Sequence, residues 1–236
     1  MAEAVVLIPD LMCDARIFEH QINALSSECA VTIAAPVSGE RIEEMASAIL
    51  DGVPRRFALA GLGLGATVAL EVFRRAPERV SRLALISVDP QAEIPAKAAE
   101  RELLIARARA GRLEEVALQL WGPDPVAQGL QRMEIQGCLR RMATELGPDL
   151  FLRQARALQR RRDYQGELRR IKVPTMVIGG LEDRAIPAKR QQFMADLIPR
   201  ATLRLIEGAA RFPVLETPEA MTETLADWLA LPLVLG

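Results

Sequence analysis

Short, continuous apolar runs alternate with longer amphipathic stretches along most of this chain, and this alternation constrains its fold more than any other feature. The runs lack a period-two pattern, as is typical of parallel strands that are buried on both faces. We expect strands at residues 5–8, 30–34, 57–61, 83–88, 175–179 and 202–206. We expect helices between them at residues 15–25, 42–50, 66–76, 188–198 and 218–229. This order predicts a doubly wound, mostly parallel α/β sheet of about six strands with right-handed crossovers.

Residues 91–172 break this rhythm, because they show helical periodicity and no convincing strand. Four helices are expected there, the last two at 126–146 and 148–162. We therefore predict a core made of residues 1–90 and 173–236, and a helical cap made of residues 91–172. A chain of 236 residues, 50% of them hydrophobic, is long enough for one sizeable core.

Charge and cysteine content exclude several classes of protein. Thirty basic residues face 31 acidic ones, so nothing in the net charge indicates a nucleic-acid partner or a membrane surface. No apolar run reaches the about 20 residues that a transmembrane helix needs. The three cysteines are far apart and form no metal-binding motif, which favours a reducing cytoplasm and no metal. We expect no cofactor, and a homodimer is possible.

The most informative segment is FALAGLGLGATVAL at residues 57–70, where a buried strand leads through alternating glycines into a helix. One interpretation is a nucleophile elbow, G-x-S-x-G, with Gly61 and Gly65 at the flanks and Gly63 at the serine position. A second is a dinucleotide-binding turn, G-x-G-x-x-G/A, with Ala66 at its last position. A third is a glycine-rich turn that serves packing alone.

Four further segments support the first interpretation. They are LIPDLMCDARIF (7–18), APERVSRLAL (76–85), PTMVIGGLEDRAIP (174–187) and IEGAARFPVLETPE (206–219). In this order they resemble the oxyanion loop, the stretch after the elbow helix, the acid loop and the histidine loop of α/β-hydrolase-fold proteins. The resemblance is to the small carboxylesterase and 2-succinyl-cyclohexadiene-carboxylate-synthase-like group, and it covers nearly the whole chain. It implies a helical cap and places Asp183 at the catalytic-acid position.

The chain departs from this family at three positions. Gly63 replaces the serine nucleophile, Arg211 stands at the histidine position, and Asp10 occupies a place in the oxyanion loop that is usually glycine. Arginine stays protonated to about pH 12 or beyond, so Arg211 cannot act as a base. The single histidine, His20, lies on the first expected helix, and we interpret it as structural.

These departures predict an unusual site. We expect an ion pair between Asp183 and Arg211 beside a space left by the missing serine side chain. The backbone N–H of Leu64 points into this space from a helix N-terminus, which favours anions. The predicted ligand-binding residues are Asp10, Leu11, Met12, Gly63, Leu64 and Arg211. Candidate acid–base groups are Asp10, Asp14 and Asp183, and the predicted ligand is a small, carboxylate-bearing molecule.

Three functions are compatible with such a site. The first is a non-hydrolytic enzyme that performs a decarboxylation, cyclisation or elimination on a small acidic metabolite, with Arg211 and carboxylates as its working groups. The alternative is a catalytically inactive binding or scaffolding protein. A weaker alternative is a dinucleotide-binding oxidoreductase. The run Arg160-Arg161-Arg162 is interpreted as a solvated helix end.

Overall fold

The computed structural model describes residues 3–121, 125–129 and 131–233 and contains one six-stranded sheet. The strands are β1 (Val5–Ile8), β2 (Val31–Ile33), β3 (Phe57–Leu62), β4 (Val80–Ile86), β5 (Thr175–Gly180) and β6 (Ala201–Ile206). Their order is β2-β1-β3-β4-β5-β6, and every neighbouring pair is parallel. The predicted doubly wound parallel α/β sheet of about six strands is confirmed.

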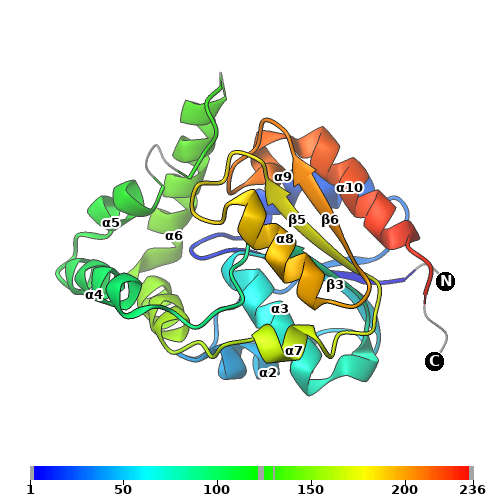
Figure 1. The fold of residues 1–236 in the computed structure, drawn as a ribbon. Helices are drawn as coiled ribbons and strands as arrows, with labels where there is room; N and C mark the ends of the chain where they lie inside the picture. The colour runs from blue at the N-terminus through cyan, green and yellow to red at the C-terminus, as the bar shows by residue number, and fades with distance from the viewer. Residues whose placement is uncertain (1–2, 122–124, 130, 234–236) are drawn as a thin grey trace.

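Helices cover the sheet on both faces. They are η1 (Ala15–Phe18), α1 (Glu19–Leu25), α2 (Ile42–Gly52), α3 (Leu64–Arg75), η2 (Pro77–Arg79), α4 (Pro95–Arg109), α5 (Leu113–Leu120), α6 (Arg132–Gln159), α7 (Gln165–Leu168), α8 (Ala188–Leu197), α9 (Pro213–Glu216) and α10 (Pro218–Ala230). Helix α2 packs on α3, α8 packs on β5 and β6, and α1 contacts α10. Figure 1 shows α8 and α10 on opposite sides of β6, with α4, α5 and α6 gathered to one side of the sheet.

The segment expected to be helical contains α4, α5, α6 and α7, and no strand among its described residues. Helix α6 starts at Arg132 rather than at 126 and is interrupted by Gly147, whose φ is 80°, followed by Pro148. The predicted break between two helices therefore falls at a real kink; residue 130 lies outside the described residues. Within the described part of the chain, no helix is long and apolar enough to cross a bilayer. The division into core and cap stays a prediction.

The position of a strand in the sheet decides how much of it is buried. All residues of β1, β3 and β4 are buried, as the continuous apolar runs predicted. The edge strands β2 and β6 are only partly buried, and Thr202 and Arg204 on β6 are exposed. The expectation of full burial is wrong for these two strands, because each has a neighbour on one side alone.

The order in which strands are added to the sheet changes side between β1 and β3. The chain first adds β2 on one side of β1 and then adds β3 on the other side, with all strands parallel. Sites in open α/β sheets form beyond the carboxyl ends of strands at such a switch point. Asp10 follows β1, Gly63 follows β3, Ser87 follows β4, Asp183 follows β5, and Arg211 follows β6. Because the strands are parallel, the five loops that follow their carboxyl ends lie on the same side of the sheet, although they are distant in sequence.

Candidate functional site

The turn between β3 and α3 has the shape of a nucleophile elbow. Gly63 lies at its apex with φ 55° and ψ −112°, a left-handed conformation that glycine adopts without steric cost. The Gly63 N–H donates to the Ile86 carbonyl at 2.9 Å, which ties the turn to β4. A Cβ atom on Gly65 would overlap the Ile8 carbonyl, so this glycine lets α3 approach β1 closely.

The Asp10 carboxylate fills the apex of this turn. A Cβ atom on Gly63 would overlap the carboxylate, so a side chain at position 63 and Asp10 in this place exclude each other. Asp10 is fully buried, and its Oδ1 accepts hydrogen bonds from the N–H groups of Leu11, at 2.7 Å, and Leu64, at 2.6 Å. The predicted empty space beside Gly63 is therefore wrong. The anion that the α3 N-terminus attracts is the chain's own Asp10.

Arg211 pairs with Asp10, so the predicted Asp183–Arg211 ion pair is wrong. Its Nε and Nη2 donate to Asp10 Oδ2 at 3.2 and 2.9 Å, and 22% of its side chain is exposed. Burial lowers the pKa of Arg211, but the charges of Asp10 and Asp183 outweigh this effect and hold that pKa above its ordinary value. Arg211 is therefore a permanent cation at the base of the site.

Asp183 is turned toward its own loop, which explains why it does not bind Arg211. Its Oδ1 accepts the N–H groups of Ala185, at 2.8 Å, and Ile186, at 3.0 Å. Its buried Oδ2 makes no hydrogen bond with any residue that the structure describes. Asp183 thus acts on Arg211 through its charge and not through a direct bond.

The loop that carries Asp10 is held by a residue of α6. Met12 has a positive φ of 52°, and its N–H donates to Gln154 Oε1 at 2.8 Å. Gln154 Nε2 donates in turn to the Pro36 carbonyl at 3.1 Å.

Two other residues of the loop are not free to react. Burial and the Asp10 charge raise the pKa of the Cys13 thiol, and Asp14 bonds Arg16 at 2.6 Å.

Glu216 holds the loop that carries Arg211, and the sequence analysis missed it. Its Oε2 accepts the N–H groups of Ala210, at 3.0 Å, and Phe212, at 2.7 Å, on either side of Arg211. Its Oε1 accepts the Ala127 N–H at 2.5 Å. Burial raises the pKa of Glu216, and these three N–H groups oppose that effect. An acidic residue within the apolar stretch FPVLE was the available signal.

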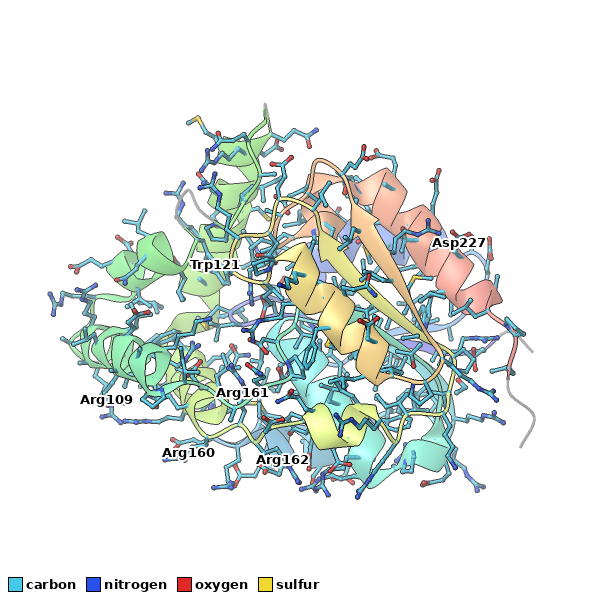
Figure 2. All side chains as sticks on the ribbon, in the orientation of Figure 1. Arg109, Trp121, Arg160, Arg161, Arg162 and Asp227 are labelled. Atoms are coloured by element: carbon cyan, nitrogen blue, oxygen red, sulfur yellow. The ribbon has the colours of Figure 1, made fainter. Side chains whose placement is uncertain are left out.

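A cavity of about 270 Å³ lies above the turn and is lined by Gly63, Leu64 and Arg211 from the sheet edge. Its other walls include Ser87 after β4, Trp121 after α5 and Arg161 after α6. Figure 2 shows Trp121 between the helices α5 and α6 and the helix α8. Ser87 and Trp121 were not predicted as site residues, since neither belongs to a recognisable motif.

Arg161 contradicts the expectation that residues 160–162 form a solvated helix end. Its side chain is 11% exposed, and it donates to the Gln91 carbonyl at 2.9 Å and to Glu93 at 3.1 Å. Glu93 also binds Arg101 at 2.8 Å and is itself 1% exposed. Arg160 and Arg162 are solvent-exposed, and Figure 2 shows both on the lower side of the molecule. The run lies just beyond the end of α6 at Gln159, and there the chain turns Arg161 inward toward Gln91 and Glu93.

His20 is exposed on α1 and does not line the cavity. Among the described residues, no three His, Cys, Asp or Glu side chains come together as a metal site requires. The groups that can contact a ligand in this cavity are therefore Arg211 at its base and the polar side chains on its walls, while Asp10 is fully buried behind Gly63 and Arg211.

A buried parallel strand, a tight turn at positive φ and a helix N-terminus facing the loop after β1 define a doubly wound α/β protein with a nucleophile-type elbow. The chain belongs to the alpha/beta hydrolase family, whose sequence profile matches residues 5–224.

Individual relatives agree with this assignment. The pimeloyl-[acyl-carrier protein] methyl ester esterase of Photobacterium profundum is 29% identical over 202 residues, covering 82% of this chain and 78% of the relative. The corresponding esterase of Nitrosomonas europaea is 25% identical over 210 residues, covering 85% and 80%. A thermophilic esterase from Thermogutta terrifontis has a similar fold, with a TM-score of 0.88 at 23% identity, covering 97% and 90%.

These relatives are named as hydrolases, and they contradict the expected function. The predictions of a non-hydrolytic enzyme, of an inactive binding or scaffolding protein and of an oxidoreductase were wrong. The sequence analysis treated Gly63 and Arg211 as two separate losses. In the structure, both positions contact a third departure, Asp10, whose carboxylate occupies the apex. That carboxylate also stands at the helix N-terminus where a dinucleotide phosphate would have to bind, which removes the physical basis for a nucleotide turn.

Proposed function

We propose that this protein hydrolyses carboxylic esters, with the Asp10 carboxylate at the place that a serine side chain takes in a nucleophile elbow. The proposal rests on the position of Asp10 Oδ1, which lies 2.6 Å from the Leu64 nitrogen. It occupies the apex of the turn, where Gly63 has no side chain. The family and the esterase names of the relatives supply the reaction class. The chain's own residues supply the mechanism.

Asp10 is the group proposed to take the proton from the attacking water. Arg211 stays protonated because neighbouring carboxylates raise its pKa. Cys13 stays a thiol because burial raises its pKa well above the ordinary value. A general base needs a lone pair within reach of the water at the carbonyl. Asp10 is fully buried directly behind Gly63 and Arg211, so the proposed step requires the water to enter beside the apex of the turn. The hydroxide formed attacks the ester carbon, and the alcohol leaves with the proton.

Arg211 is proposed to stabilise the oxyanion of the tetrahedral intermediate. Asp10 occupies the two backbone N–H groups of Leu11 and Leu64, so another donor must serve the substrate oxygen. The Nε and Nη2 of Arg211 are held by Asp10, while Nη1 makes no hydrogen bond to a residue in the described part of the chain. Arg211 also lines the cavity. A fixed cation at this place stabilises the charge that develops in the transition state.

The charge of the cavity favours an ester that carries an acidic group. Four cationic side chains line it, Lys97, Arg101, Arg161 and Arg211, against Asp89 and Glu93, and Asp10 pairs with Arg211 from behind the lining, which leaves an excess of one cation. A cavity with an excess of one charge concentrates ligands of the opposite charge. The proposed substrate is therefore a small ester of a dicarboxylic acid. A cytoplasmic location and a homodimer stay predictions.

The proposal is tested with monomethyl esters of C4–C7 dicarboxylic acids and with neutral methyl esters of the same length. We expect hydrolysis of the acidic series and resistance to fluorophosphonates, which label activated serines. Asp10→Asn should lower kcat by about 100-fold or more, as loss of a general base does. Asp227→Asn, an exposed change on α10, should leave kcat unchanged.

Single-turnover reactions in ¹⁸O-water separate two roles of Asp10. Direct water attack places the label in the released acid and leaves the protein unlabelled, whereas label found in Asp10 after the first turnover would identify attack by Asp10. An absence of hydrolysis above the uncatalysed rate, full activity of Asp10→Asn, or labelling by fluorophosphonate would each overturn the proposal.

A further inference from the structure

Two polar atoms on the cavity walls lack a partner. Ser87 Oγ and Trp121 Nε1 are buried and make no hydrogen bond with any residue that the structure describes. Both side chains line the same cavity as Gly63 and Arg211. Buried polar groups are nearly always hydrogen-bonded, because desolvation without a partner is costly. Two such atoms in one cavity indicate a site that is complete only with a ligand.

The backbone of Ser87 supports this interpretation independently. Ser87 has φ 47°, and Met12 is the only other non-glycine residue with a positive φ in the described part of the chain. Met12 belongs to the loop that carries Asp10, and Leu11 of the same loop lines the cavity. Strain of this kind persists where the surrounding structure enforces it and concentrates at functional sites. The strained conformation directs the end of β4 into the cavity wall.

Trp121, which lines the same cavity, packs against a neighbouring ring. Its ring packs edge-on against Phe212, with the centroids 5.2 Å apart and an interplanar angle of 75°. Phe212 directly follows Arg211, and its N–H is bound by Glu216. The indole is therefore fixed relative to Arg211, and a ligand can use its N–H without ordering a mobile side chain. Figure 2 shows Trp121 at the junction between the helices α5 and α6 and the sheet.

We propose that Ser87 and Trp121 form a subsite that binds a carboxylate group of the ligand. An indole N–H only donates, and a serine hydroxyl can donate as well, so a group with two acceptor oxygens satisfies both. The cationic excess of the cavity favours an ionised acceptor over a neutral one. The subsite rests on the proposed function in assigning this carboxylate to the acid end of the ester substrate, but its binding is measurable without turnover.

The chain offers a direct test, because it contains two tryptophans and hence two indole N–H signals in a ¹⁵N correlation spectrum. The buried Trp228 Nε1 also lacks a hydrogen-bond partner among the described residues, but it lies on α10 and does not line this cavity. Titration with glutarate should move the Trp121 signal saturably and leave the Trp228 signal in place. Glutaramide, a neutral counterpart, should move neither signal.

Matched variants then assign the binding to both side chains. Ser87→Ala and Trp121→Phe should each weaken glutarate binding about fivefold, the effect of one lost hydrogen bond. Ser81→Ala and Trp228→Phe remove buried groups that also lack a partner in the described structure, outside the cavity, and should leave the affinity unchanged. Equal movement of both indole signals, movement of neither, or full affinity in Ser87→Ala together with Trp121→Phe would overturn the subsite.

Kinetics keep this inference separate from the proposed reaction. With monomethyl glutarate, Ser87→Ala and Trp121→Phe should raise KM about fivefold and leave kcat nearly unchanged, as expected for lost uniform binding. With methyl butyrate, neither variant should change KM. A Trp121 signal that responds to glutarate in a protein that hydrolyses no ester would overturn the reaction and support the subsite. Ester hydrolysis by a protein whose Trp121 signal does not move with glutarate would support the reaction and overturn the subsite.

Discussion

The base and the walls of the cavity differ in how completely their polar atoms are satisfied. At the base, the Asp10 carboxylate accepts four hydrogen bonds from Leu11, Leu64 and Arg211. On the walls, Ser87 Oγ and Trp121 Nε1 have no partner among the described residues. The base is internally complete and holds a charged pair in place, whereas the walls are incomplete and indicate where a ligand binds. The proposed chemistry and the proposed recognition thus depend on different residues of one site.

The largest expected effect on stability comes from removing the Asp10–Arg211 ion pair at the base of the cavity. Asp10→Asn removes the charge that compensates Arg211 and should lower the free energy of unfolding by about 3 kcal/mol, since an unpaired buried charge is costly. Urea unfolding of the variant and the wild type measures this difference. Asp227→Asn breaks the exposed Arg204–Asp227 pair and should change stability by less than about 0.5 kcal/mol. Equal losses in both variants would contradict the special role of the base.

The next effect tests whether Asp10 and Gly63 form one unit. Gly63→Ser places a side chain where the carboxylate lies and should lower the free energy of unfolding by about 2 kcal/mol. Adding Asp10→Gly removes the overlap, so the double variant should be more stable than the sum of the single effects predicts. We expect a coupling energy of about 1–2 kcal/mol, measured by a double-mutant cycle in urea. Additive losses would show that the two positions are independent.

A substitution of Ser87 on the cavity wall is expected to change the free energy of unfolding by less and in the opposite direction. Ser87→Gly removes the strain at φ 47° and should raise the free energy of unfolding by about 1 kcal/mol, while it weakens glutarate binding. Ser81→Gly, within the strand β4 that Ser87 directly follows, has no such strain to relieve and should destabilise the protein. Thermal unfolding and the glutarate titration together measure this opposition. A less stable Ser87→Gly variant would contradict the strain argument.

The smallest expected effect concerns how the free energy of unfolding falls as the pH is lowered into the acidic range. Burial raises the pKa of Glu93, but its hydrogen bond to Arg101 and the charges of Arg101 and Arg161 outweigh this and hold the pKa below its ordinary value. The unfolded state then takes up the proton first, as pH falls through about 4.3. The contribution of Glu93 is present above that pH and is lost as pH falls through the lower, folded-state pKa.

Glu93→Gln should therefore flatten the fall in unfolding free energy below about pH 4.3. Urea midpoints at a series of pH values between 3 and 7 measure this slope, and Glu115→Gln in an exposed pair on α5 is the comparison. An unchanged slope in Glu93→Gln would contradict the role of this carboxylate.

The sequence alone determined the sheet, because hydrophobic periodicity and glycine spacing are local signals. Continuous apolar runs and the turn at Gly61, Gly63 and Gly65 predicted all six parallel strands and the elbow, although the strand expected at 83–88 is β4 at Val80–Ile86. The sequence also marked Asp10, Gly63 and Arg211 as departures. Burial of the edge strands and the inward turn of Arg161 were mispredicted, since both depend on neighbours that are distant in the chain.

The tertiary structure alone decided what these departures mean. Residues 10, 63 and 211 follow three different strands, and only parallel pairing at the switch point brings them into contact. The same packing turned Asp183 away from Arg211, and it left Ser87 and Trp121, which line one cavity, with polar atoms that have no partner in the described structure. Pairing and desolvation depend on distances in space, and a linear pattern of residue types does not contain those distances.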